Sequence, residues 1–198
     1  MSVAVINYHL GMGRWEPDAV GRLQQAALAL YAERGFEPTA VADIAERAGL
    51  TERTFFRYFA DKREVLFVGS GELVELFERG IAQAPESLPP LDAVGEALRA
   101  AAAFFEDRKE HARIRQAVIA ANPSLQEREL TKLASLSTAM AAALRSRGVS
   151  DLAATLAAEA GVTIFKVSFE RWVEETSDQH LSDLMRDTLE ELRAATRR

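Results

Sequence analysis

Apolar residues recur along almost the whole chain with the 3.6-residue period of an amphipathic α-helix. Prolines and glycines interrupt this pattern, and no segment alternates apolar and polar residues over more than a few positions, as a half-buried strand would. The periodicity therefore predicts an all-α fold with about nine helices. They are expected at residues 17–34, 41–48, 51–59, 62–84, 91–107, 110–121, 124–147, 151–175 and 181–195.

Composition excludes several kinds of site. The 198 residues include no cysteine, so neither a disulfide nor a thiolate zinc site can form. The histidines, His9, His111 and His180, lie far apart in sequence, which argues against a metal site, and we expect no cofactor. No apolar run approaches the ~18 residues of a membrane span, and the first residues lack the basic segment of a signal peptide. We expect a cytoplasmic protein with no membrane partner.

The pattern divides the chain into three regions. Residues 1–13 precede the first helical segment and are interpreted as a flexible extension. Residues 14–62 hold one longer and two shorter helical segments, the latter joined by a glycine-containing turn, which is the helix-turn-helix pattern. Residues 63–198 hold the remaining helices and are interpreted as a larger helical domain.

The helix expected at residues 51–59 has two different faces. Phe55 and Phe59 lie four residues apart, so they share one face, which we expect to be buried. The open side and its edges carry Glu52, Arg53, Thr54, Phe56, Arg57 and Tyr58. In a DNA major groove, arginine at the start of such a helix can bond guanine O6 and N7, and glutamate can accept from cytosine N4.

The charge of this region favours DNA only locally. The whole protein carries a net charge of −6, and residues 1–67 hold eight basic and nine acidic residues. From Arg47 to Arg63, however, five basic residues stand against two acidic ones. Such a patch can steer phosphates, while the acidic remainder limits non-specific binding. From the residues alone, a helix pair with a merely solvated basic face stays an alternative to DNA binding.

Residues 18–67 resemble the DNA-binding domain of the TetR family of transcriptional regulators. The matching stretch reads ALALYAERGFEPTAVADIAERAGLTERTFFRYFADKREVLF. Its marks are Tyr31, Gly35 and Phe36 around the end of the first helix, then Thr39, IAERAG and the TFFRYF run. The resemblance implies a helical DNA-binding domain whose recognition helix is residues 51–58.

The resemblance also implies roles for individual residues. Those that stand where the family contacts bases are Glu52, Arg53 and Thr54. Those that stand where it contacts phosphates are Thr39, Thr51, Tyr58 and Lys62. Phe56 replaces a frequent tyrosine and is expected to touch a thymine methyl or a sugar, with Arg57 beside it on the DNA side. Arg14 either reaches the minor groove or is an ordinary solvated arginine.

The larger domain shows no catalytic motif: a nucleophile elbow, a P-loop and a dinucleotide loop are all missing. The segment from Asn122 to Gly148, with Trp172 later, resembles the C-terminal domain of mycofactocin-type regulators, which points to an acyl or other lipophilic effector. Some apolar side chains here either line a ligand pocket or simply fill the core. These are Phe104, Phe105, Met140, Phe165 and Phe169.

The last two expected helices carry wide apolar faces, and the final one repeats apolar residues at helical spacing. The TetR family pairs its last two helices across a two-fold axis, so we expect a homodimer built on residues 151–195. The residues expected at its interface are Phe169, Trp172, Leu181, Leu184, Met185, Leu189 and Leu192. Docking of the same stripe on its own subunit is the alternative.

These features predict a ligand-responsive transcriptional regulator. It would bind a palindromic operator as a homodimer, act as a repressor as is usual in the family, and be released by a small apolar or amphipathic effector. One alternative is a small all-α enzyme or binding protein whose helix-turn-helix is only structural. Another is a DNA-binding protein without an effector. The lack of a convergent nucleophile, base or metal set argues against an enzyme.

Overall fold

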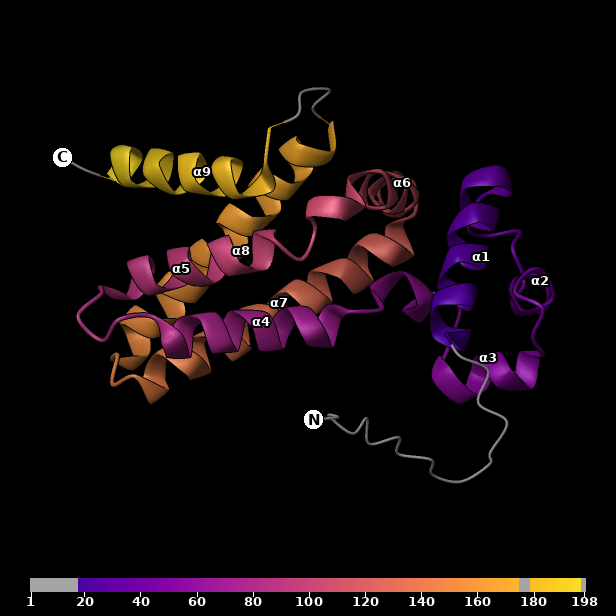
Figure 1. Ribbon diagram of the computed structural model, residues 1–198, viewed down its shortest axis with the longest axis horizontal. Coiled ribbons are helices and arrows are strands. Elements are labelled where there is room, and N and C mark those ends of the chain that lie inside the picture. The colour runs from indigo at the N-terminus through magenta and orange to yellow at the C-terminus, as the bar shows by residue number, and fades with distance from the viewer. Residues whose placement is uncertain (1–17, 175–178, 197–198) are drawn as a thin grey trace, which may run out of the picture.

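The computed structural model describes residues 18–174 and 179–196, and this part of the chain is helical without a strand (Figure 1). The all-α prediction is confirmed, with nine α-helices in the described residues. They are α1 (Ala19–Arg34), α2 (Val41–Arg47), α3 (Glu52–Tyr58), α4 (Ser70–Gln83), α5 (Pro90–Ala102), α6 (Lys109–Ala120), α7 (Pro123–Ser146), α8 (Asp151–Glu174) and α9 (Leu181–Thr196). Two short 3-10 segments are η1 (Glu64–Phe67) and η2 (Glu106–Arg108).

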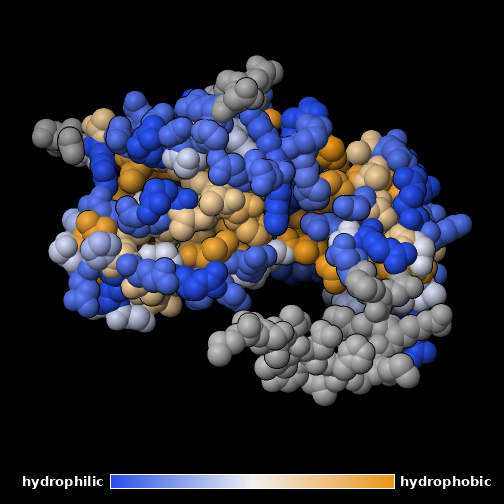
Figure 2. Space-filling model, viewed as in Figure 1, coloured by the Kyte–Doolittle hydropathy of each residue, from blue (hydrophilic) through white to orange (hydrophobic). Residues whose placement is uncertain are grey.

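The helices enclose two hydrophobic cores. Helices α1 to α3 and η1 form a small N-terminal domain at one end of the molecule, and α4 to α9 form a larger C-terminal domain (Figure 1). Within the larger domain, α8 packs against α5, α7 and α9. On the face in Figure 2, hydrophobic residues gather in a band that runs through the larger domain toward the smaller one.

The short helices α2 and α3 are joined by a tight turn. Gly49 has a φ of +67° there, a left-handed conformation that glycine adopts without a steric cost. Thr51 caps α3, because its hydroxyl accepts a hydrogen bond from the amide of Thr54 at 3.2 Å. Phe55 and Phe59 are buried beneath the helix with ring centroids 5.3 Å apart, as predicted. This anchorage turns the opposite face of α3 outward.

The helix predicted over residues 62–84 is interrupted in the structure. Segment η1 is followed by Gly69, whose φ of +85° turns the chain before α4 begins. Val65, Leu66 and Phe67 are buried in the N-terminal core, together with side chains from α6 and α7. The N-terminal core therefore extends past the boundary expected at residue 62, and the two domains share a packed junction.

The helix predicted over residues 91–107 ends early, at Ala102. Phe104 and Phe105 lie in the turn that follows it. That turn carries the ring of Phe105 to α8, where its centroid lies 5.9 Å from that of Phe165 and 5.2 Å from that of Phe169. The early end of α5 thus builds an aromatic cluster that a continuous helix would have dispersed.

Helix α8 is long and apolar enough, by length and composition, to cross a membrane, which corrects the expectation that no stretch approaches that limit. Half of its most apolar window is buried inside the protein. Its contacts with α5, α7 and α9 place one side of the helix in the C-terminal core, while Leu152, Leu156 and Val167 are exposed on another side.

The apolar stripe expected at a dimer interface lies in the subunit's own core. Its members on α9 pack against α5 and α8, and Phe169 and Trp172 belong to α8 itself. Its buried members are Phe169, Trp172, Leu181, Leu184, Met185 and Leu189. Leu192 is partly buried against the same core. The buried members of this stripe are therefore committed to the subunit's own core, and the homodimer itself stays a prediction.

Candidate DNA-binding surface and effector cavity

Helix α3 presents a polar face to solvent. Thr51, Glu52, Arg53 and Arg57 are exposed on it, and Phe56 exposes 55% of its surface. No carboxylate pairs with Arg53 or Arg57 among the described residues. An exposed guanidinium without a carboxylate partner keeps donors free for a base edge or a phosphate. This face has the chemistry that the sequence predicted for a recognition helix.

The edge of this face is ordered by contacts within α3. Arg57 donates from Nη2 to the hydroxyl oxygen of Tyr58 at 2.9 Å, and its guanidinium lies 4.7 Å from the centroid of that ring. The hydroxyl oxygens of Thr51 and Thr54 are 3.0 Å apart. Because Tyr58 accepts the bond from Arg57, its own O–H stays available as a donor.

Two residues expected to contact phosphates are instead committed inside the domain. Thr39 is 1% exposed, and its hydroxyl donates to the carbonyl oxygen of Gly35 at 2.7 Å. The ammonium of Lys62 donates to the carbonyl oxygens of Phe36, Glu37 and Thr39 at 2.9–3.0 Å. A lysine has three N–H donors, so none is left for a phosphate. Both side chains therefore hold the domain together in this structure.

The basic patch is also smaller than the sequence count indicates. Arg47 forms a two-pronged ion pair with Glu33, with N–O distances of 3.0 and 2.8 Å. Arg63 pairs in the same way with Asp61, at 2.7 Å for the shortest contact. Among the described residues from 47 to 63, only the two arginines of α3 remain exposed without a carboxylate partner. Arg14 lies outside the described residues.

A cavity of about 490 Å³ lies at the junction of the two domains. Four of the five side chains expected at a pocket line it, namely Phe104, Phe105, Phe165 and Phe169. The fifth, Met140, is fully buried elsewhere in the C-terminal core and does not line this cavity. The volume lies in the range usual for small-molecule sites, ~300–1,000 Å³.

The N-terminal domain contributes directly to the wall of this cavity. Gly21, Gln24 and Gln25 of α1 line it, as do Leu66 and Phe67 of η1. A molecule held there would therefore touch α1, whose side chains share one hydrophobic core with those of the recognition helix α3. The sequence had placed the pocket entirely within the larger domain.

Charged groups make the cavity amphipathic. Its cationic side chains are Arg108, Arg115, Lys132 and Lys166, and its carboxylates are Asp107, Glu110, Glu129 and Glu170. The guanidinium of Arg108 lies 4.3 Å from the ring centroid of Phe104. Burial lowers the pKa of His111, which also lines the cavity, and the charges of Arg115 and Arg108 lower it further. His111 thus favours its neutral form while no anion is bound beside it.

Arg115 ties the cavity wall to η1. Its Nε donates to the carbonyl oxygen of Leu66 at 2.7 Å, and its Nη1 donates to Oε1 of Glu129 at 3.0 Å. The guanidinium also lies 5.1 Å from the ring centroid of Phe67. One side chain of α6 therefore joins η1, α7 and the cavity.

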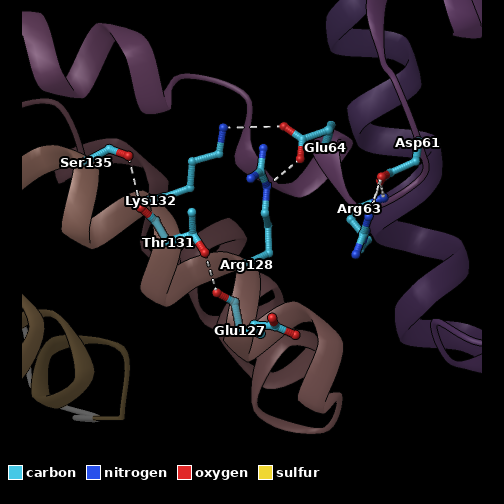
Figure 3. Close-up of polar contacts among 8 residues, drawn as sticks. All are labelled: Asp61, Arg63, Glu64, Glu127, Arg128, Thr131, Lys132 and Ser135. Atoms are coloured by element: carbon cyan, nitrogen blue, oxygen red, sulfur yellow. Dashed lines mark hydrogen bonds and ion pairs between the residues drawn. The ribbon is translucent and has the colours of Figure 1, made fainter.

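A polar groove of about 770 Å³ runs between the N-terminal domain and α7. Figure 3 shows Arg128 and Lys132 extending from α7 toward Glu64 of η1. The Arg128 Nε lies 2.6 Å from Oε1 of Glu64, and the Lys132 Nζ lies 3.4 Å from Oε2. The hydrogen bond from Arg128, followed by the charge of Lys132, holds the pKa of Glu64 below its ordinary value.

Sequence analysis did not identify these junction residues. The only signal was the four-residue spacing of Arg128 and Lys132, which places both on one helix face. Their partner Glu64 lies 64 residues before Arg128, so the pairing could not be read from the chain. Arg115 lies in an ordinary charged helical segment, and no sequence motif there indicates that it contacts η1.

Two family models match the chain. The model for bacterial regulatory proteins of the tetR family matches residues 23–67, which run from α1 to the end of η1. The model of the MftR C-terminal domain matches residues 88–197, more than half of the chain.

Curated relatives agree with these matches. TcmR of Streptomyces glaucescens, an HTH-type transcriptional regulator, is 38% identical over 79 residues, which are 40% of this chain and 35% of TcmR. MftR of Mycobacterium tuberculosis is 34% identical over 125 residues, 62% of each chain. The chain thus spans 35% and 62% of the length of these two relatives.

Solved structures share the fold. FadR from Bacillus subtilis, solved with stearoyl-CoA, has a TM-score of 0.61 at 19% identity and covers 87% of this chain and 96% of its own. FadR from Thermus thermophilus, a TetR family repressor solved with lauroyl-CoA, has a TM-score of 0.56 at 23% identity. The match covers 90% of this chain and 95% of that FadR chain. The matched families and curated relatives are transcriptional regulators. With the MftR C-terminal model matching over half of its length and the tetR model matching its helix-turn-helix, the chain belongs to the TetR family of transcriptional regulators.

Proposed function

We propose that this regulator is a repressor that binds an approximately palindromic operator as a homodimer and leaves it when an amphipathic effector occupies the junction cavity. The observation that carries the proposal is the cavity's position. Its wall includes Gly21, Gln24 and Gln25 of the DNA-binding domain and the aromatic cluster of the effector domain. A ligand that fits the cavity in one domain arrangement and not in another shifts the balance between them.

DNA readout is assigned to the exposed face of α3. Arg53 and Glu52 stand at the start of the helix, where side chains reach base edges in the major groove. Thr51, Arg57 and Tyr58 flank them and serve as phosphate contacts, while Phe56 meets a thymine methyl or a sugar. With so few unpaired cations and a net charge of −6, we expect weak non-specific binding and a modest salt dependence.

The effector is proposed to carry an apolar chain and an anionic group. Aromatic and aliphatic side chains from α4, α7 and α8 suit a chain, and the arginines and lysines of the wall suit an anion. Two proteins of the same fold were solved with stearoyl-CoA and lauroyl-CoA, which supports an acyl-type ligand here. A cytoplasmic site of action follows from the DNA target.

The homodimer is proposed to form on the outward face of α8. Three of the five exposed large apolar side chains in the described residues lie on this helix, namely Leu152, Leu156 and Val167. Their spacing of four and eleven residues places them on one face. A monomer in water rarely keeps such a stripe uncovered, and a two-fold axis would pair it with itself.

One experiment tests the function. The protein is incubated with a random DNA pool, and bound fragments are recovered and sequenced. We expect enrichment of two related half-sites in inverted repeat, about 10–10.5 base pairs or a multiple apart. Titration of decanoate or lauroyl-CoA into the complex should then lower operator affinity by ~1–3 kcal/mol. Enrichment without any ligand response would support the alternative of a DNA-binding protein without an effector, and no enrichment would contradict both.

A further inference from the structure

The effector cavity and the polar groove share a wall. Four residues line both spaces, namely Phe67, Val68, Ser70 and Lys132. Lys132 is the charged member of this set. It projects from α7 toward Glu64 (Figure 3), and because it lines both spaces, a ligand in the cavity and the groove's carboxylate can compete for it.

In the structure the ammonium of Lys132 is paired with η1. It lies 3.4 Å from Oε2 of Glu64, and the two side chains expose 29% and 22% of their surface. Because both side chains are partly buried, salt screens the attraction between their charges less than it screens a fully exposed ion pair. The other cavity lysine, Lys166, behaves differently, because its contact at 3.9 Å is with Glu170 of its own helix. Arg115 is already held by a carbonyl oxygen and by Glu129.

We propose that Lys132 makes the response selective for effectors that carry an anionic group. An anion in the cavity draws the ammonium away from Glu64, which leaves Arg128 as the carboxylate's remaining cation and loosens η1 from α7. A neutral amphiphile of the same chain length fills the cavity and leaves the pair in place. This inference rests on the proposed function, because it names the feature of the effector that drives release from DNA.

The expected selectivity is modest. Partly exposed ion pairs couple weakly, so the loss of one pair should change operator affinity by about three- to fivefold. Coupling is reciprocal, so operator DNA should weaken the binding of decanoate about three- to fivefold more than the binding of decan-1-ol.

The first test compares two probes, sodium decanoate and decan-1-ol, both below the concentration at which they aggregate. The affinity of the wild type for DNA recovered from the random pool is measured without a probe and with each probe at saturation. Decanoate should weaken operator binding about three- to fivefold more than decan-1-ol. Lys132→Met should respond equally to both, and Lys132→Arg should keep the difference. Lys166→Met, which also removes a cavity cation, should weaken decanoate binding and still distinguish the two probes.

The second test uses Glu64→Gln. Glu64 lines the groove and not the cavity, so this substitution removes no ligand contact. If the anion competes with Glu64 for Lys132, the variant should bind decanoate about three- to fivefold more tightly in calorimetry. It should also lose the difference between decanoate and decan-1-ol in operator release. A merely structural ion pair would leave decanoate affinity unchanged or weaken it.

The outcomes separate the inference from the function beneath it. A wild type that enriches no DNA overturns the proposed function. A wild type that binds its operator but releases it equally with both probes overturns the inference alone. Release with neither probe overturns the effector response of the proposed function as well. A Lys132→Met variant that folds, as judged by circular dichroism, and still distinguishes decanoate from decan-1-ol likewise overturns the inference alone.

Discussion

Arg53 stands at the exposed start of α3 without a carboxylate partner in the described residues, so its donors are free for a guanine edge. Arg53→Ala is expected to cost about 1–3 kcal/mol in operator binding and to relax the preference at one base pair per half-site. Competition binding against single-base operator variants measures both effects. Arg47→Ala is the matched control, since that arginine is held by Glu33 and should change operator affinity by less than ~0.5 kcal/mol. An unaltered base preference in Arg53→Ala would remove Arg53 from the readout.

Lys62 is expected to act on stability and not on phosphate binding. Its ammonium donates to three carbonyl oxygens and lies 4.4 Å from the ring centroid of Phe36. Lys62→Ala leaves those acceptors without their charged donor, which should lower the free energy of unfolding by about 1–3 kcal/mol. Urea denaturation measures this loss, and the salt dependence of operator binding should not change. A stable variant with a reduced salt slope would show that the side chain reaches a phosphate after all.

Single residues were predictable where a pattern decides between burial and exposure. The four-residue spacing identified Phe55 and Phe59 as anchors and left Arg53 outside, as the structure has them. Thr39 and Lys62 were not predictable, because a family position says where a residue stands but not which carbonyl oxygens its side chain meets. Met140 had the same apolar character as the cavity side chains, and only packing places it in the core.

At the scale of elements, the turn at Gly69 links the two domains. Its φ of +85° strains any residue with a Cβ, so Gly69→Ala should lower the free energy of unfolding by about 1–2 kcal/mol. Gly71 is the matched control, because it lies inside α4 and an added Cβ would meet nothing within 4 Å. Gly71→Ala should be neutral or stabilise by up to ~1 kcal/mol. Equal effects in thermal denaturation would mean that the turn carries no strain.

The ion pairs between η1 and α7 should make stability depend on acid pH. The folded pKa of Glu64 lies below its unfolded value of ~4.3, so the pairs stabilise the protein fully above that pH. The stabilisation is lost as the pH falls through the folded pKa, because the unfolded state then binds the proton more readily. The difference in unfolding free energy between the wild type and Glu64→Gln should therefore shrink below about pH 4. A difference that stays constant from pH 7 to pH 3 would contradict the shift.

Most elements could be read from the chain, because glycines stop the helices at Gly35 and Gly49 as predicted. The helix predicted over residues 62–84 does not form as one continuous helix, because tertiary packing overrides the local pattern. Its apolar residues have helical spacing, but Val65 and Leu66 are needed in the N-terminal core, and the chain must then turn into the second domain. The local periodicity of a segment does not indicate that its two parts pack into different hydrophobic cores.

For the whole molecule, the dimer prediction now rests on α8. Leu152 and Leu156 expose 71% and 61% of their surfaces on the outward face of this helix, where a second subunit would bury them. We expect the wild type to sediment as a dimer at micromolar concentration, with an interface above ~1,000 Å² and recognition helices able to reach ~34–36 Å apart. Leu156→Lys places a charge in that contact and should yield monomers with at least tenfold weaker operator binding, about 1.4 kcal/mol. Leu130→Lys changes a leucine that is 60% exposed on α7 and should remain dimeric. A wild type that stays monomeric even with operator DNA would contradict the homodimer and the palindromic operator together.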